Sequence, residues 1–310
     1  MSDSTDGTPR GLSGQDFDYL SFAQFVLLHA GCALLFWTGV SAVAVGACFI
    51  FYCLRIFGLS AGYHRYFSHL SYRTGRVFQF LLAFLGATAY QKGPLWWVAH
   101  HRWHHLHADR ADDIHSPVKD GFWWAHCGWI FSLRNRGMDE RLVPDLRKYR
   151  ELRLLDRFYM LPPLMLAVST YLLGALLERS APGLRTSGLQ MLVWGFFVST
   201  VLVHHGTYCA NSFGHLFGGR RFDTKDGSRN NLFVALITFG DGWHNNHHHY
   251  PPSARHGFYW WEIDVTLYVL KGLSRLGLVW GLKSPPERVY AEAPALKAAS
   301  YKFREGWTRK

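Results

Sequence analysis

The chain has 310 residues and a net charge of +11, with 18% charged residues, 16% aromatic residues and 18 histidines. Abundant apolar side chains exclude a disordered, collagen-like or coiled-coil chain, and five scattered cysteines with no CxxC pair disfavour a disulfide-stapled module or a thiolate zinc site. A basic excess can indicate nucleic-acid binding. Here charge-free stretches alternate with basic loops, which favours a membrane protein with no nucleic-acid partner.

Residues 1–20 form a polar, acidic stretch, which we interpret as an N-terminal tail and not as a signal peptide. Four apolar stretches follow, at residues 22–38, 40–54, 158–177 and 189–208. A helix needs about 20 apolar residues to cross the hydrocarbon core, so we expect the second to continue to residue 60, with Arg55 reaching for the headgroups. A soluble bundle of buried helices is the alternative, and four such stretches in one chain disfavour it.

A fifth apolar run, residues 77–90, is too short for a crossing and predicts an interfacial or re-entrant segment. Basic residues concentrate in residues 60–157 and 210–310, which places these regions and both termini in the cytoplasm. The predicted fold is therefore an all-α membrane protein with four transmembrane helices in two hairpins and a helical cytosolic cap. We expect one membrane domain over residues 21–290 and a C-terminal tail over residues 291–310.

The histidines gather in short segments with regular spacing. HRYFSH contains His64 and His69, and one further segment, NSFGHLFG, pairs Asn211 with His215 at the end of the fourth span. The other two segments, HHRWHH and HNNHHH, repeat one spacing (i, i+3, i+4), which puts three imidazoles on one helix face: His101, His104, His105 and His244, His247, His248.

Imidazole is the commonest nitrogen ligand of transition metals, so this pattern predicts iron, copper or zinc, and the number of ligands predicts two metal ions. His64 and His69 are five residues apart and would diverge by about 140° on an α-helix. They therefore face different metals, or their segment leaves α-helical geometry. All segments must lie on one membrane face to meet, which the four spans allow only if residues 77–90 do not cross.

HRYFSH, HRWHH, NSFGHLFG and HNNHH, in this order among four spans, resemble the membrane fatty-acid desaturases over roughly residues 20–285. The similarity is strongest to the acyl-CoA (stearoyl-CoA type) delta-9 desaturases and their bacterial relatives. The resemblance implies a His-rich dimetal site with two non-haem iron ions. Its ligands would be His64, His69, His101, His104, His105, His215, His244, His247 and His248, with Asn211 reaching the site through water.

The resemblance also implies a reaction: insertion of a cis double bond into a long saturated acyl chain, with dioxygen reduced to water. The substrate would be a long-chain acyl-CoA or acyl-lipid. Two electrons would come from a separate donor such as a ferredoxin, rubredoxin or cytochrome with its reductase, because few residues remain after Pro286 for a haem domain. The location would be a lipid bilayer, in bacteria the cytoplasmic membrane.

Other histidines lie close to these segments, and for them we expect orienting or surface roles: His100, His107, His115, His126, His204, His205 and His249. Several tryptophans flank the second segment and are equally compatible with an acyl tunnel or an interfacial belt: Trp96, Trp97, Trp123, Trp124 and Trp129. A di-iron membrane hydroxylase or monooxygenase is the alternative within the enzymes. A His-rich metal transporter is the alternative from another class, and it would place its ligands inside the spans.

Overall fold

The structure is a computed structural model that describes residues 16–293. Four helices are long and apolar enough to cross a membrane: Tyr19–Thr38, Ala42–Ser68, Leu161–Ser180 and Gly188–Leu216, with 20, 27, 20 and 29 residues. At 1.5 Å per residue, even 20 residues reach about 30 Å, the thickness of the hydrocarbon core. Only two short strands occur within residues 16–293, and these pair antiparallel: β1 (Arg73–Thr74) and β2 (Val279–Trp280). The predicted helical fold with four candidate spans is confirmed.

Local signals mark the ends of the spans. Asp18 Oδ1 accepts hydrogen bonds from the first backbone N–H groups of the first span, and Ser41 Oγ does the same for the second. Gly39, with φ of +66°, separates the two. In the structure these spans comprise α1 (Tyr19–Cys32), α2 (Leu35–Thr38), α3 (Ala42–Phe57) and a π-helical segment, Gly58–Ser68.

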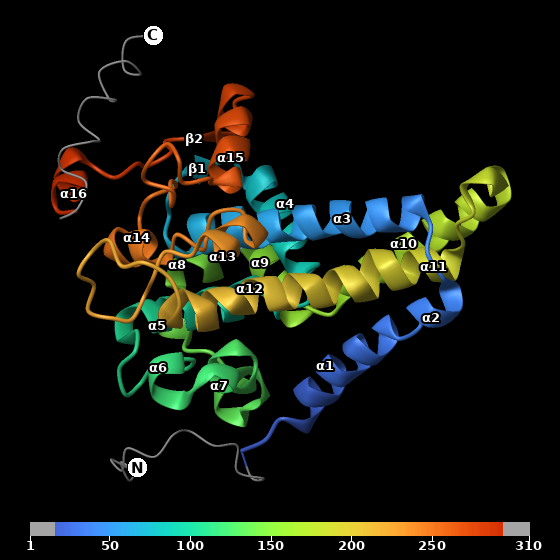
Figure 1. The fold of residues 1–310 in the computed structure, drawn as a ribbon, viewed down its shortest axis with the longest axis horizontal. Helices are drawn as coiled ribbons and strands as arrows, with labels where there is room; N and C mark the ends of the chain where they lie inside the picture. The colour runs from blue at the N-terminus through green and yellow to red at the C-terminus, as the bar shows by residue number, and fades with distance from the viewer. Residues whose placement is uncertain (1–15, 294–310) are drawn as a thin grey trace.

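The third span is α10 (Leu161–Ser180), and the fourth comprises α11 (Gly188–Leu192), a π-helical segment (Val193–Val198) and α12 (Ser199–Leu216). In Figure 1, α3 and α12 run side by side and α1 runs at an angle to them. Many large apolar side chains of the four spans are exposed. Small residues allow close approach: a Cβ on Gly174 would lie 2.4 Å from Ser187 O. The second and fourth spans extend beyond the predicted ends and carry His64 and His215 on their last turns.

Arg55 does not reach for the headgroups, so that prediction is wrong. Its side chain is 1% exposed and lies between the second and fourth spans. The guanidinium donates to Phe51 O at 2.9 Å, to Thr200 Oγ1 at 2.7 Å and to Ser199 Oγ. Hydroxyls on the neighbouring helix satisfy its donors, so the cation points inward.

The apolar run after the second span forms α4 (Arg76–Ala87), whose 12 residues are too few for a crossing. A Cβ on Gly58 would lie 2.7 Å from Gly86 N, so α4 packs tightly against the π-helical end of the second span. Of the two predicted tails, residues 1–15 and 294–310 lie outside the described residues.

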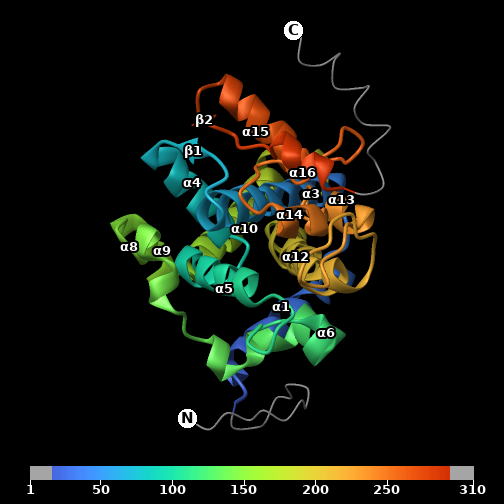
Figure 2. The same cartoon turned by 90° about the vertical axis from the view of Figure 1, so that its left-hand side faces the viewer.

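The other helices are short and gather mainly at one end of the long helices, at the left of Figure 1 and facing the viewer in Figure 2. They are α5 (Pro94–His107), α6 (Pro117–Asp120), α7 (Phe122–His126), α8 (Pro144–Arg147), α9 (Arg150–Arg157), α13 (Leu232–Ile237), α14 (His244–His249), α15 (Val265–Arg275) and α16 (Glu287–Ala291). Short 3-10 turns link several of them, Gly128–Phe131, Leu133–Asn135 and Glu140–Leu142, and a fourth, Pro182–Leu184, lies between the third and fourth spans. The end of the bundle that holds these helices also holds the histidine segments.

Candidate metal centre

The nine predicted histidine ligands lie in two adjoining groups. Group A consists of His64, His69, His101, His105 and His247, and group B of His104, His215, His244 and His248. Within each group, one ring nitrogen of every member lies within 4.8 Å of the others. Residues separated by up to 183 positions therefore converge as two sets of possible metal ligands. The two groups adjoin, since the rings of His104 and His105 are 5.6 Å apart.

His64 and His69 both belong to group A because their segment is π-helical. In a π-helix, hydrogen bonds join residues five apart, which brings these residues onto the same side of the helix. Of the two possibilities for this pair, departure from α-helical geometry is the one observed. π-helical turns are frequent at functional sites for this reason.

The repeated i, i+3, i+4 spacing divides each segment between the groups. On α5, His101 and His105 join group A while His104 joins group B. On α14, His247 joins group A while the other two join group B. Each helix therefore lies along the boundary between the groups, which spacing alone does not reveal.

Distances within the groups suit a bound cation better than hydrogen bonding alone. His247 Nε2 lies 2.9 Å from His64 Nε2 and 3.0 Å from His105 Nε2. Nε2 of a neutral imidazole carries either one proton or one lone pair and therefore forms one hydrogen bond. That bond accounts for only one of the two short contacts of His247 Nε2. Nitrogens roughly 2.1 Å from a common metal and at right angles would be about 3 Å apart. The residues thus fit a metal.

Group B gives a second sign of the same kind. His215 Nε2 and His244 Nε2 are 3.1 Å apart. Nε2 of His104 and of His248 are buried and make no hydrogen bond within residues 16–293. A buried polar atom without a partner is costly, and a metal ion at this position would remove the cost.

Four aspartates orient the imidazoles, and sequence reasoning missed all of them. Asp241 lies 3.1 Å from Nδ1 of His64, Asp113 3.0 Å from that of His104, Asp109 2.9 Å from that of His215 and Asp226 2.9 Å from that of His248. A ring that donates its Nδ1 proton to a carboxylate presents the lone pair of Nε2 to the metal.

The sequence held a partial signal for these carboxylates. Asp109 and Asp113 follow His105 by four and eight residues, and Asp241 precedes His244 by three. Their proximity in sequence reflects proximity in space. Asp226 lies in the loop between α12 and α13 and had no such signal. His256, 3.1 Å from Asp241 through Nδ1 and fully buried, was also missed.

Five of the nine rings have a pKa that favours the neutral form, whereas at His104 the contact with Asp113 outweighs burial and raises the pKa. Burial and the neighbouring imidazoles hold the pKa of His69, His101, His105, His244 and His247 well below the usual value. These rings are therefore neutral, as ligation requires. Burial also opposes ionisation of Asp109, but its contacts with His215, Ser116 and Gly227 outweigh this and lower its pKa to about 2.

The remaining histidines stand outside both groups. His100 and His107 each bond a carbonyl one turn earlier on α5, and His249 pairs with Glu292 at 2.8 Å. Three others bond within or beside the spans: His204 to Ala89 O at 3.0 Å, and His205 to His126 at 2.9 Å. His115 stacks on His104 with ring centroids 4.3 Å apart.

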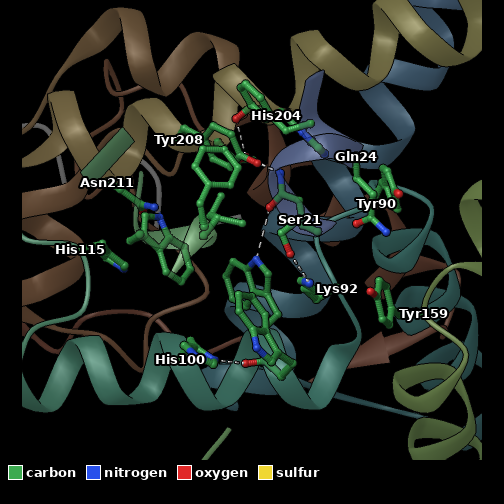
Figure 3. A pocket seen from close by; sticks show the side chains of 18 of the residues that line it. Ser21, Gln24, Tyr90, Lys92, His100, His115, Tyr159, His204, Tyr208 and Asn211 are labelled. Atoms are coloured by element: carbon green, nitrogen blue, oxygen red, sulfur yellow. Dashed lines mark hydrogen bonds between the residues drawn. The ribbon is translucent and has the colours of Figure 1, made fainter. Parts of the chain in front are cut away.

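An apolar cavity adjoins the histidine groups and has a volume of about 870 Å³, part of which is open to solvent. His101, His115 and Asn211 line its wall near the groups, and Figure 3 shows Tyr90, Lys92 and Tyr159 on the opposite side. Asn211 belongs to neither group and lies one turn before His215 on α12. The aromatic walls, by contrast, come from residues that the sequence left undecided: Trp96, Trp97 and Trp129 line the cavity, while Trp123 is 74% exposed.

Comparisons with known proteins agree with this site. The sequence model of the fatty acid desaturase family matches residues 20–272. The chain is 36% identical over 288 residues to an icosanoyl-CoA 5-desaturase of Limnanthes douglasii, covering 91% of this chain and 76% of that protein.

The names of two further relatives specify acyl groups attached to other carriers. Identity is 36% over 282 residues to an sn-2 palmitoyl-lipid 9-desaturase of Nostoc sp. (strain 36), covering 89% of this chain and 94% of the relative. It is 36% over 293 residues to a hex-5-enoyl-[acyl-carrier protein] acetylenase of Moorena producens (strain JHB), covering 90% and 89%. With its two histidine groups and adjoining cavity, this chain belongs to the fatty acid desaturase family and is a fatty acyl desaturase.

Proposed function

We propose that the chain inserts a cis double bond at the delta-9 position of a long saturated acyl chain, using dioxygen, two non-haem irons and two electrons from a separate donor protein. The observation that carries the proposal is the apolar cavity that adjoins two convergent histidine groups. A long methylene chain suits such walls, and a chain carbon placed by His101 and Asn211 would lie beside group A.

Group A and group B would each hold one iron, with Asn211 reaching the site through water. Bound iron supplies the activation of dioxygen that removal of hydrogen from an unactivated methylene requires. The chain's own residues then have three tasks. The imidazoles hold the ions, the four aspartates set the direction of the rings, and the aromatic wall keeps water from the reacting carbon.

We propose that the substrate is a long-chain acyl-CoA or an acyl-lipid. Among the described residues that line the cavity, Lys92 is the one lysine or arginine, and its Nζ lies 3.1 Å from Ser21 Oγ. A cation on the side of the cavity away from the histidines is suited to the polar end of an acyl substrate. The curated relatives act on acyl groups attached to CoA, to a lipid and to acyl carrier protein, so the carrier must be measured directly.

The proposed location is the cytoplasmic membrane of a bacterium, with four spans arranged as two hairpins. Basic residues concentrate in the segments that hold the histidines, which supports a cytosolic cap formed by the short helices. Because α4 is too short to cross, an even number of spans separates all histidine segments, and both ends of the membrane domain would lie inside.

The test is mass spectrometry of total fatty acids from cells that express the chain, with His104→Ala as the inactive control. A new cis-9 mono-unsaturated acid formed only by the unchanged chain is the expected result, and two irons per chain in the purified protein would accompany it. A double bond at another carbon would refute the position, and a hydroxy acid would move the chain to the monooxygenases. Isolated CoA esters and glycerolipids, supplied separately, identify the carrier.

A further inference from the structure

A second cavity, of about 680 Å³, opens beside the histidine groups and shares no lining residue with the apolar one. The end of α5 contributes His105 and the loop after it Arg110; the loop between α12 and α13 contributes Asp223–Asp226, and α14 contributes His248 and His249. Its walls are mostly polar side chains. Such a lining does not suit an acyl chain.

Each histidine group presents one ring to this cavity. His105 belongs to group A and His248 to group B, and both line the cavity. The two rings stack on each other, with centroids 4.5 Å apart and planes inclined by 29°. Neither lines the apolar cavity, which contacts group A through His101, one helical turn earlier on α5.

We propose that this polar cavity is where a small acidic one-electron carrier protein docks and delivers electrons through the edges of His105 and His248. The inference rests on the proposed function, whose balance requires such a partner. Dioxygen needs four electrons and four protons to become two waters. The acyl chain supplies two of each as its –CH2–CH2– unit becomes –CH=CH–, the carrier supplies two electrons in two steps, and solvent supplies two protons.

Geometry favours this position over other parts of the surface. Electron transfer between proteins falls steeply with distance, so the carrier must approach both metal sites closely. At the polar cavity a single contact area reaches one ring of each group, and the stacked pair gives the first electron access to either site. The substrate cavity remains free, because the two cavities lie on different walls of the site.

The charges on the rim determine the kind of partner. Arg110 and Lys225 are exposed, and Arg220 reaches the rim by donating to Thr224 O at 2.7 Å. Three acids lie near them: Asp226 contacts Nδ1 of His248 at 2.9 Å, Asp223 lies 3.7 Å from Arg220, and Glu292 lies 2.8 Å from His249. Arg110 and Lys225 form no ion pair within residues 16–293, so these two cations would steer an acidic surface toward the rim.

The test measures binding separately from turnover. The full iron-loaded chain in lipid nanodiscs is titrated with two acidic probes, a plant-type [2Fe–2S] ferredoxin and a cytochrome b5, at about 0.01 M and about 1 M ionic strength. We expect Arg110→Glu with Lys225→Glu to weaken binding of at least one probe about tenfold at the lower salt, and a smaller loss for Arg110→Gln with Lys225→Gln. The matched control reverses two exposed charges on α15, Lys271→Glu with Arg275→Glu, and should bind like the unchanged chain.

Equal weakening by the control pair, unchanged binding in the rim variants, or no salt-sensitive binding of either probe to the unchanged chain would each overturn the docking proposal. A separate readout isolates the proposed function: the unchanged chain is reduced with dithionite, without any carrier, and then given dioxygen and substrate. Desaturated product in that reaction upholds the function even where docking fails, and its absence counts against the function alone.

Discussion

Asp113 offers the sharpest test of how the aspartates position the metal ligands. Its side chain is fully buried and contacts Nδ1 of His104 through both oxygens, at 3.0 and 3.1 Å. Two backbone N–H groups, of Asp109 and His115, hold the carboxylate in place at 2.8 and 3.2 Å. Asp113→Asn keeps the size of the side chain but replaces one acceptor oxygen with a donor.

The magnitude follows from the proton on His104. If the new side-chain amide of residue 113 donates a hydrogen bond to Nδ1 of His104, that nitrogen must be unprotonated. The neutral ring would then carry its proton on Nε2, the atom whose lone pair would bind the metal. Loss of a carboxylate that orients a ligating histidine costs about 10- to 100-fold in metal affinity, or roughly 1.4 to 2.7 kcal/mol. Only group B contains His104, so the loss should fall on one of the two ions.

The assay is iron titration of the purified chain against a chelator of known affinity, with Asp112→Asn as the matched control, since Asp112 is adjacent and exposed. We expect one weakened and one unchanged iron site in the Asp113 variant, and two unchanged sites in the control. Two unchanged sites in the Asp113 variant would refute the orienting role of the carboxylate. Equal loss at both sites would refute the assignment of His104 to a separate group.

Three further outcomes follow from contacts around the site. Arg102→Ala removes two charged hydrogen bonds to Asp145, at 2.7 and 2.9 Å. It should lower the free energy of unfolding by about 2 kcal/mol and reduce the iron content. A melting temperature equal to that of the unchanged chain would contradict this. Gly58→Ala places a Cβ 2.7 Å from Gly86 N and should destabilise the chain by about 1–3 kcal/mol in chemical denaturation, and no change would mean that α4 moves away freely. In the folded chain the pKa of Asp109 is lowered to about 2. Its contribution to stability is therefore complete above about pH 4 and is lost as the pH falls toward 2. If the stability of the metal-free protein did not change between these pH values, the contact with His215 would be contradicted.

Properties that depend on neighbouring residues could be predicted from the sequence. Four candidate spans follow from the length of charge-free stretches, and the histidine segments follow from their spacing, while the resemblance to the desaturases supplied the set of nine predicted ligands. The short fifth run was likewise interpretable, because hydrophobic length alone decides whether a helix can reach across a bilayer. These features can be read from the sequence because hydropathy and residue spacing depend only on residues that are close together in the chain.

Arg55 shows where this reasoning ends. From the sequence, a cation near the end of an apolar stretch is expected to extend toward water. In the folded chain, Ser199 and Thr200 stand opposite it on another span, more than 140 residues away, and their hydroxyls satisfy the guanidinium inside the bundle. The direction of a long side chain depends on which partners the fold brings near.

The sequence by itself determined the helical membrane fold, the metal-binding residue types and the family resemblance. Tertiary structure decided how the histidines divide into two groups, which aspartates orient them, and that Trp96 and Trp129 face a cavity. A metal site and a cavity wall are made from side chains on helices far apart in the chain. Their distances depend on how those helices pack and on two π-helical segments; the spacing of His64 and His69 indicated the first only as one of two possibilities, and no spacing indicated the second.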